Sequence, residues 1–190
     1  MYNKKVCILG AAGVGKSSLI RRFKSGKFNE ACMSNTGARI NKVIRSIEHD
    51  KVQLMLWDIQ DESDAPGGFL NYIKNTSAII YVVDGTRLET LKVAMELRLE
   101  TEKHLASGVP SIILFNKSDL VKGWEVSSNM ISKIESEGIV AILTSCKEGT
   151  GVNTAFNLIT RVVMGKTAMI TNFTIPSDQA GAKPPFPTSI

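Results

Sequence analysis

A glycine-rich segment near the start of the chain has the residue types of a phosphate-binding loop. It reads Gly10-Ala11-Ala12-Gly13-Val14-Gly15-Lys16-Ser17 and follows the apolar run Val6-Cys7-Ile8-Leu9. Between a strand and a helix, the backbone N–H groups of such a loop converge on the α- and β-phosphates of a nucleotide. The lysine reaches the β- and γ-phosphates, the hydroxyl residue sits on Mg²⁺, and the helix adds its positive N-terminal end. The segment therefore predicts a site for a nucleoside triphosphate with Mg²⁺.

The simpler alternative for this segment is a strand-to-helix turn with an exposed lysine. The strand, the loop and the helix all fall where the phosphate-binding motif requires them, which favours nucleotide binding. The loop alone does not choose between ATP and GTP, or between a hydrolase, a kinase and a switch.

A second polar segment, Asn116-Lys117-Ser118-Asp119, follows the apolar run Ile112-Ile113-Leu114-Phe115. The Asp119 carboxylate can accept from the ring N–H and the exocyclic amine of guanine, and adenine lacks both donors at these positions. Two charge-assisted hydrogen bonds of about 1.5–3 kcal/mol each discriminate between the bases by roughly 10²–10⁴. We expect Asn116 to bond a ring nitrogen and the stem of Lys117 to cover the base plane. With the phosphate loop, this segment favours GTP over ATP.

Two weaker signals fit the same ligand. Thr144-Ser145-Cys146-Lys147 follows the last predicted strand, where backbone N–H groups can bind the guanine oxygen. Such a segment is also typical of an ordinary helix-capping turn. Phe28 follows the first predicted helix, and its ring either stacks edge-on against the base or packs on that helix.

Composition limits the class of protein. The chain has 190 residues, a net charge of +5 and three cysteines without metal-ligand or disulfide spacing,. Many basic residues lie around the first predicted strand and helix without interleaved aromatic residues, which favours a solvated face near a polyanion over a nucleic-acid surface,. No stretch has the length of a signal peptide's apolar region or of a membrane span, so we expect a reducing, cytoplasmic environment.

Apolar runs that predict strands alternate with segments of helical periodicity. The predicted strands are 4–9, 38–47, 52–57, 78–83, 111–115 and 139–143, and the predicted helices are 16–24, 88–105, 126–137 and 152–164. The link Glu48-His49-Asp50-Lys51 predicts a hairpin and one antiparallel pair,. We therefore expect an α/β fold: a six-stranded, mostly parallel sheet with one antiparallel edge strand and helices on both faces. Ligands of such sheets bind outside the carboxyl ends of the strands, where the phosphate loop falls.

In order and spacing, these motifs resemble those of the small GTPases of the Ras superfamily, and most closely the Rab branch. The similarity covers about residues 4–165, and the Rab likeness rests on Trp57 before Asp58, on Tyr72 and on the run Ile79-Ile80-Tyr81-Val82-Val83-Asp84. The resemblance implies a three-layer P-loop NTPase fold, the Ras-like G domain, here over residues 1–168. From about Met169 the chain carries Pro, Gly, Ser and Thr without periodicity, which predicts a disordered tail over 169–190,. It also implies a switch that binds GTP or GDP with Mg²⁺ and acts in vesicle trafficking or signalling.

The resemblance implies particular site residues. Mg²⁺ is expected on Ser17 and, through water, on Asp58, and Lys16 is expected to act in catalysis as well as binding. The expected nucleotide contacts are Ala12, Gly13, Val14, Gly15, Lys16, Ser17, Ser18, Phe28, Asn116, Lys117, Asp119, Leu120, Ser145, Cys146 and Lys147.

The two switch loops depart from the family pattern. Counting back from Trp57 places Asn35 where the family has a threonine that ligates Mg²⁺ and meets the γ-phosphate. An amide oxygen can ligate Mg²⁺, so we favour Asn35 as a weakened ligand, with Thr36 as the alternative after a small register shift.

In the second switch loop the chain reads Asp58-Ile59-Gln60-Asp61-Glu62, so that Asp61 replaces the family's glycine and Glu62 its catalytic glutamine. Two carboxylates beside the γ-phosphate repel it unless they are neutralised or turned outward. Losing one transition-state group typically costs about 10²–10³ in rate, so we expect slow intrinsic GTP hydrolysis. The alternative is a guanine-nucleotide-bound interaction module with little or no hydrolysis.

Partner recognition is also expected to differ. Rab relatives present an aromatic triad to effectors, and here its positions hold Ile40, Trp57 and Tyr72, although Trp57 and Tyr72 can also be simple packing residues. The resemblance implies effectors, exchange factors or GTPase-activating proteins at this face. No cysteine follows Cys146, so no lipid anchor is visible in this chain,. Either the protein works without one, or the sequence belongs to a longer chain with a lipidated tail or a second domain. We expect any contact with membranes to come through partners.

Overall fold

The computed structural model describes residues 1–26, 38–59 and 68–167. The strands are β1 (Tyr2–Leu9), β2 (Ala38–Ile47), β3 (Asp50–Ile59), β4 (Ala78–Asp84), β5 (Ser111–Asn116) and β6 (Val140–Leu143). The helices are α1 (Lys16–Ser25), α2 (Leu70–Ile73), α3 (Glu89–His104), the 3₁₀ turn η1 (Val121–Gly123), α4 (Ser128–Ser136) and α5 (Val152–Val163).

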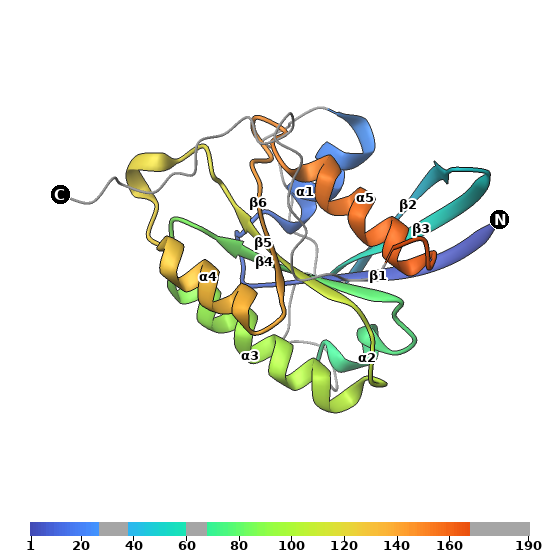
Figure 1. The fold of residues 1–190 in the computed structure, drawn as a ribbon, viewed down its shortest axis with the longest axis horizontal. Coiled ribbons are helices and arrows are strands. Elements are labelled where there is room, and N and C mark those ends of the chain that lie inside the picture. The colour runs from blue at the N-terminus through green and yellow to red at the C-terminus, as the bar shows by residue number, and fades with distance from the viewer. Residues whose placement is uncertain (27–37, 60–67, 168–190) are drawn as a thin grey trace.

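The strands form one six-stranded sheet in the order β2-β3-β1-β4-β5-β6. Among the described strands, only the hairpin partners β2 and β3 pair in antiparallel fashion, and the other four pairings are parallel. The carboxyl ends of the five parallel strands therefore meet at one edge, on the left of Figure 1. This topology confirms the predicted α/β fold with an antiparallel strand at its edge.

Helices cover both faces of the sheet, α1 and α5 on one side and α2, α3 and α4 on the other (Figure 1). Because successive strand residues point to opposite faces, Val6 and Ile8 join the core under α1 and α5, whereas Cys7 and Leu9 join the core under α3,. All seven residues of β4 are buried, as expected of a central strand covered on both sides,.

The observed elements begin and end within two residues of the predicted ones. The hairpin is tighter than predicted, because its turn is only Glu48 and His49, with Glu48 at φ 56°. Helix α2 and the turn η1 were not predicted, since four and three residues are too few to show a helical period,. The tail predicted over 169–190 lies outside the described residues.

Candidate functional site

The predicted phosphate loop connects β1 to α1 at the carboxyl edge of the sheet. Strand β1 ends at Leu9 and α1 begins at Lys16, so the loop has the strand and helix that the motif requires. Gly10 has φ 141°, and a Cβ added there would lie 2.2 Å from the carbonyl oxygen of Val82 on β4. The loop thus passes so close to the central strand that only glycine fits at its first position.

Lys16 folds back over this loop. Its side chain is buried, and its ammonium group donates hydrogen bonds to the carbonyl oxygens of Gly10 and Ala11, the latter at 3.1 Å. A buried ammonium is costly unless its donors are matched, and here the loop's own carbonyl groups accept them. The positive charge is therefore fixed within the loop, together with the N-terminal end of α1.

Ser17 and Asp58 lie in contact beside the loop. Strand β3 pairs with β1 so that Asp58 stands opposite Ile8, and the Ser17 hydroxyl donates to the Asp58 carboxylate at 2.5 Å. Asp58 is only 1% exposed. Hydroxyl and carboxylate oxygens are ligands that Mg²⁺ accepts, so this donor pair fits the metal: Ser17 would hold it directly and Asp58 through water.

Several predicted site residues lie outside the described ranges. These are Phe28 near the base, Asn35 and Thr36 in the first switch loop, and Glu62, with its neighbour Asp61, in the second.

Predicted base-binding residues of the 116–120 and 146–147 segments line one pocket of about 310 Å³ next to the phosphate loop, and Ser145 lies outside its lining. Its lining residues all belong to the predicted nucleotide contacts: Gly13, Gly15, Ser18, Asn116, Lys117, Asp119, Leu120, Cys146 and Lys147. Pockets of this size accommodate small-molecule ligands. Segments far apart in the sequence therefore meet at this pocket, as the order of the parallel strands requires.

Asn116 ties the loops around the pocket together. Its side-chain N–H donates to the carbonyl oxygen of Val14 at 2.8 Å, and its Oδ1 accepts from Thr144 and Cys146 at 3.3 and 3.4 Å. A Cβ added to Gly15 would lie 2.4 Å from Asn116 Nδ2, so the phosphate loop can approach this amide only with glycine there. Asn116 thus holds the phosphate loop through a hydrogen bond, a role that its place in the sequence motif did not indicate.

Asp119 is oriented by Ser145. The Ser145 hydroxyl, fully buried after β6, donates to Asp119 Oδ1 at 2.6 Å. This hydroxyl also accepts from the backbone N–H of Glu148 at 3.1 Å, which fixes the serine in turn. The side chain of Ser145 therefore positions the carboxylate, whereas the sequence suggested only a backbone contribution from this segment.

Cys146 is a buried thiol that lines the pocket. Burial raises the pKa of its thiol to about 11, against a smaller opposing effect of the hydrogen bond to Asn116. The side chain is therefore neutral near pH 7 and acts as an apolar wall with a weak donor.

Sequence reasoning missed Asp84 as part of the site. This residue ends β4, and its Oδ2 accepts from Lys117 Nζ at 2.6 Å and from Arg87 Nε at 2.9 Å. Lys117, expected to lie over the base plane, thus has its ammonium group anchored on a neighbouring strand. The signal that could have found Asp84 is an acidic residue at the carboxyl end of a central strand, the edge at which ligands bind.

The expected effector triad combines two residues of the sheet, Ile40 and Trp57, with Tyr72 of helix α2. Ile40 pairs with Trp57 across β2 and β3, and the rings of Trp57 and Tyr72 are 6.3 Å apart. Ile40 is 47% exposed, whereas the two aromatic residues are half-buried. The ammonium group of Lys5 lies 4.1 Å from the centre of the Trp57 ring, a cation–π contact,.

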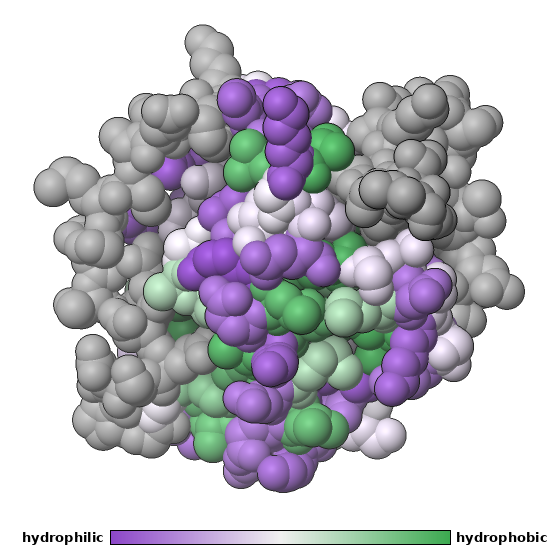
Figure 2. Space-filling view, turned by 90° about the vertical axis from the view of Figure 1, so that its left-hand side faces the viewer, coloured by the Kyte–Doolittle hydropathy of each residue, from purple (hydrophilic) through white to green (hydrophobic). Residues whose placement is uncertain are grey.

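Figure 2 looks onto the carboxyl edge of the sheet and shows hydrophilic side chains interspersed with small hydrophobic areas.

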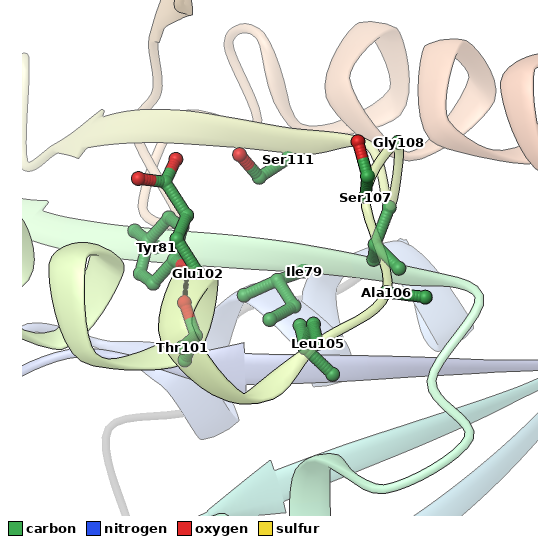
Figure 3. Close-up of a pocket in the computed structure, with 10 residues that line it drawn as sticks. Ile79, Tyr81, Thr101, Glu102, Leu105, Ala106, Ser107, Gly108 and Ser111 are labelled. Carbon is green, nitrogen blue, oxygen red and sulfur yellow. Dashed lines mark hydrogen bonds between the residues drawn. The ribbon is translucent and has the colours of Figure 1, made fainter.

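A second cavity, of about 370 Å³, lies at the opposite edge, between the end of α3 and the beginnings of β4 and β5 (Figure 3). There Tyr81 and Thr101 share a hydrogen bond between their hydroxyl groups. None of the predicted nucleotide or Mg²⁺ contacts lines this second cavity. Within the described residues, no helix has both the length and the apolar character needed to cross a bilayer.

Comparison with known proteins agrees with the motifs. The model of the Ras family matches residues 5–165. The chain is 32% identical over 187 residues to Ras-related protein Rab-8B of Pongo abelii, which covers 97% of this chain and 88% of the relative. It is 31% identical over 170 residues to Ras-related protein Rab-7L1 of Rattus norvegicus, an alignment that covers 86% of this chain and 83% of the relative. It is 29% identical over 187 residues to Ras-related protein RABD2b of Arabidopsis thaliana, with 97% of this chain and 88% of the relative covered.

Proposed function

Because the chain belongs to the Ras family, we propose that it is a Rab-like switch that binds GTP and GDP with Mg²⁺ and hydrolyses GTP slowly. The observation that carries this proposal is the assembly of one continuous site at the carboxyl edge of the sheet. Lys16 and the Ser17–Asp58 pair lie on one side of it, and the Asp119–Ser145 pair on the other. In this proposal residues 1–168 form the nucleotide domain.

Each end of the site suits one part of the ligand. The Lys16 ammonium and the first N–H groups of α1 suit the phosphates, and Mg²⁺ on Ser17 and Asp58 would neutralise phosphate charge. The oriented Asp119 carboxylate suits the adjacent donors of guanine, because adenine would leave it unpaired.

Slow hydrolysis is proposed from the sequence of the second switch loop. Glu62 stands where the family has the glutamine that orients the attacking water, and Asp61 adds another negative charge. Ras, with its glutamine, turns over without a helper protein at only about 10⁻⁴ s⁻¹, so the loss of this group leaves a very slow reaction. Partner proteins would then supply the missing catalytic group.

The same substitutions favour a second candidate, an interaction module in which the nucleotide stabilises the fold and hydrolysis contributes little. Under either candidate, effectors, exchange factors or GTPase-activating proteins are proposed to bind at the Ile40–Trp57–Tyr72 face. By likeness to the Rab proteins, we propose vesicle trafficking or signalling as the process and a peripheral association with membranes through partners.

Two measurements on the purified chain separate the candidates: the GTP turnover rate, and the ratio of the GTP and GDP affinities. A switch predicts measurable turnover that a partner protein accelerates. Equal affinities without turnover would point to the interaction module. Failure to bind either nucleotide would refute both.

A further inference from the structure

A buried acidic residue at the end of β4 connects the two halves of the proposed nucleotide site. Asp84 is 1% exposed and accepts from Lys117 Nζ, from Arg87 Nε, and from the backbone N–H and hydroxyl of Thr86 at 3.0 and 2.7 Å. Burial acts to raise the pKa of this carboxyl, but hydrogen bonds from Lys117, Thr86 and Arg87 hold it below its ordinary value. Asp84 is therefore an ionised, fully coordinated anchor for two cations.

One of these cations reaches the phosphate loop. While Arg87 Nε bonds Asp84, Arg87 Nη2 donates to the carbonyl oxygen of Ala12 at 2.9 Å. The third nitrogen, Nη1, lies 3.9 Å from Glu89. A Cβ added to Gly13 would lie 3.6 Å from Arg87 Nη2, so the guanidinium packs directly against the loop. The planar guanidinium uses one edge for both bonds, a geometry that arginine has and lysine lacks.

The bond to Ala12 has a consequence for the next N–H group along the chain. The carbonyl of Ala12 and the N–H of Gly13 belong to one peptide plane, and none of the described peptide bonds is cis. In a trans peptide these two groups point in opposite directions. Holding the carbonyl on Arg87 therefore turns the Gly13 N–H away from Arg87. In phosphate loops such N–H groups are the ones that bind the phosphates.

We propose that Arg87 is a positioning residue for nucleotide retention, which clamps the phosphate loop through Asp84 to the base-binding loop at Lys117. The clamp rests on the proposed function, because it acts on a nucleotide held by both loops. Opening the phosphate loop to release the nucleotide requires the Arg87–Ala12 bond to break or Arg87 to leave Asp84. The clamp therefore slows the release of GDP.

The test compares Arg87→Gln with the wild-type protein in two measurements. The first is the dissociation rate of fluorescent GDP in Mg²⁺ buffer, and the second is the affinity for guanosine at millimolar concentration by NMR. Losing one hydrogen bond from a charged group predicts GDP dissociation about tenfold faster. The guanosine affinity should change less than twofold, because guanosine has no phosphate for the loop to hold.

Two further variants complete the design. Arg87→Lys keeps a positive charge beside Asp84 but loses the guanidinium edge that bonds Asp84 and Ala12 at once. It should therefore release GDP nearly as fast as Arg87→Gln. Arg98→Gln removes an arginine from helix α3, which begins two residues after Arg87. Arg98 pairs there with Glu102 at 2.6 Å, and its replacement should leave GDP dissociation unchanged. If Arg87→Gln does not fold, the GDP dissociation rate of Arg87→Lys tests the clamp in its place.

The outcomes distinguish the clamp from the proposed function. If both Arg87 variants release GDP at the wild-type rate, the clamp is overturned while nucleotide binding stands. Equal losses of guanosine and GDP binding would assign Arg87 a general structural role and overturn the clamp. A wild-type protein that binds no GDP would overturn the clamp and the proposed function together.

Discussion

The hydroxyl of Ser145 holds the carboxylate of Asp119 at 2.6 Å, and the two residues come from loops that follow different strands. Their contact depends on the parallel pairing of β5 with β6, which brings the ends of these strands to the same edge. The residue proposed to read guanine is thus oriented by a second loop. Under the proposed function, base specificity would depend on both segments.

Replacing Ser145 with alanine removes the donor that orients Asp119. We expect the dissociation rate of GDP to rise about tenfold, as for the loss of one charge-assisted hydrogen bond. Stopped-flow fluorescence with labelled GDP measures this rate. The control is Ser136→Ala, which removes a serine that bonds only a backbone carbonyl on α4 among the described contacts. An unchanged rate in Ser145→Ala would show that Asp119 does not need this contact.

Replacing Gly10 with alanine places a methyl group 2.2 Å from the carbonyl oxygen of Val82, in a backbone conformation with φ 141°. Overpacking and backbone strain together should lower the free energy of unfolding by about 3 kcal/mol or more. The matched control is Gly26→Ala, where φ is 68° but an added Cβ meets nothing within 4 Å, and the expected cost is about 1 kcal/mol,. Urea denaturation measures both. Equal costs would mean that the loop does not pass this close to β4.

Restoring the family residues in the second switch loop tests the account of slow hydrolysis. In the double variant Asp61→Gly, Glu62→Gln, we expect single-turnover GTP hydrolysis to accelerate by about 10²-fold. The substitutions restore the amide that orients the attacking water in the family, and they remove two negative charges that would repel the γ-phosphate. Nucleotide affinity should change much less. No gain in rate would refute this explanation.

The Cys146 thiol should resist alkylation in the folded protein. With its pKa raised to about 11, the thiol is protonated at pH 8 and only about one molecule in a thousand carries the reactive thiolate,. In a Cys32→Ser background, iodoacetamide should label Cys146 at under about 1% of the rate seen in urea. Cys7, whose pKa burial also raises, is the internal control. Rapid labelling of Cys146 alone in the folded state would contradict its burial.

Much of the fold was predictable because its signals are local. Strands β4 and β5 are short apolar runs bounded by polar residues, and β2 matched its predicted bounds because a polar turn marks its end. The helix α2 escaped prediction, since four residues carry no period, and its place is set by tertiary packing of Ile73 into the core.

The site was predictable where a motif is contiguous, as from Gly10 to Ser17 and from Asn116 to Asp119. It was not predictable where the partner is remote in the chain. The Asp84–Lys117 ion pair joins residues 33 positions apart, and the bond from Arg87 to Ala12 spans 75 positions. Such contacts follow from the strand order in the sheet, which no single segment of the sequence specifies.

Competition against labelled GDP tests directly whether this site binds a guanine nucleotide through Asp119. Unlabelled GDP and ADP are titrated against the complex in Mg²⁺ buffer. We expect GDP to displace the label at a concentration at least about 100-fold lower than ADP, because only guanine satisfies both oxygens of the carboxylate. Displacement by ADP within threefold of GDP would contradict it.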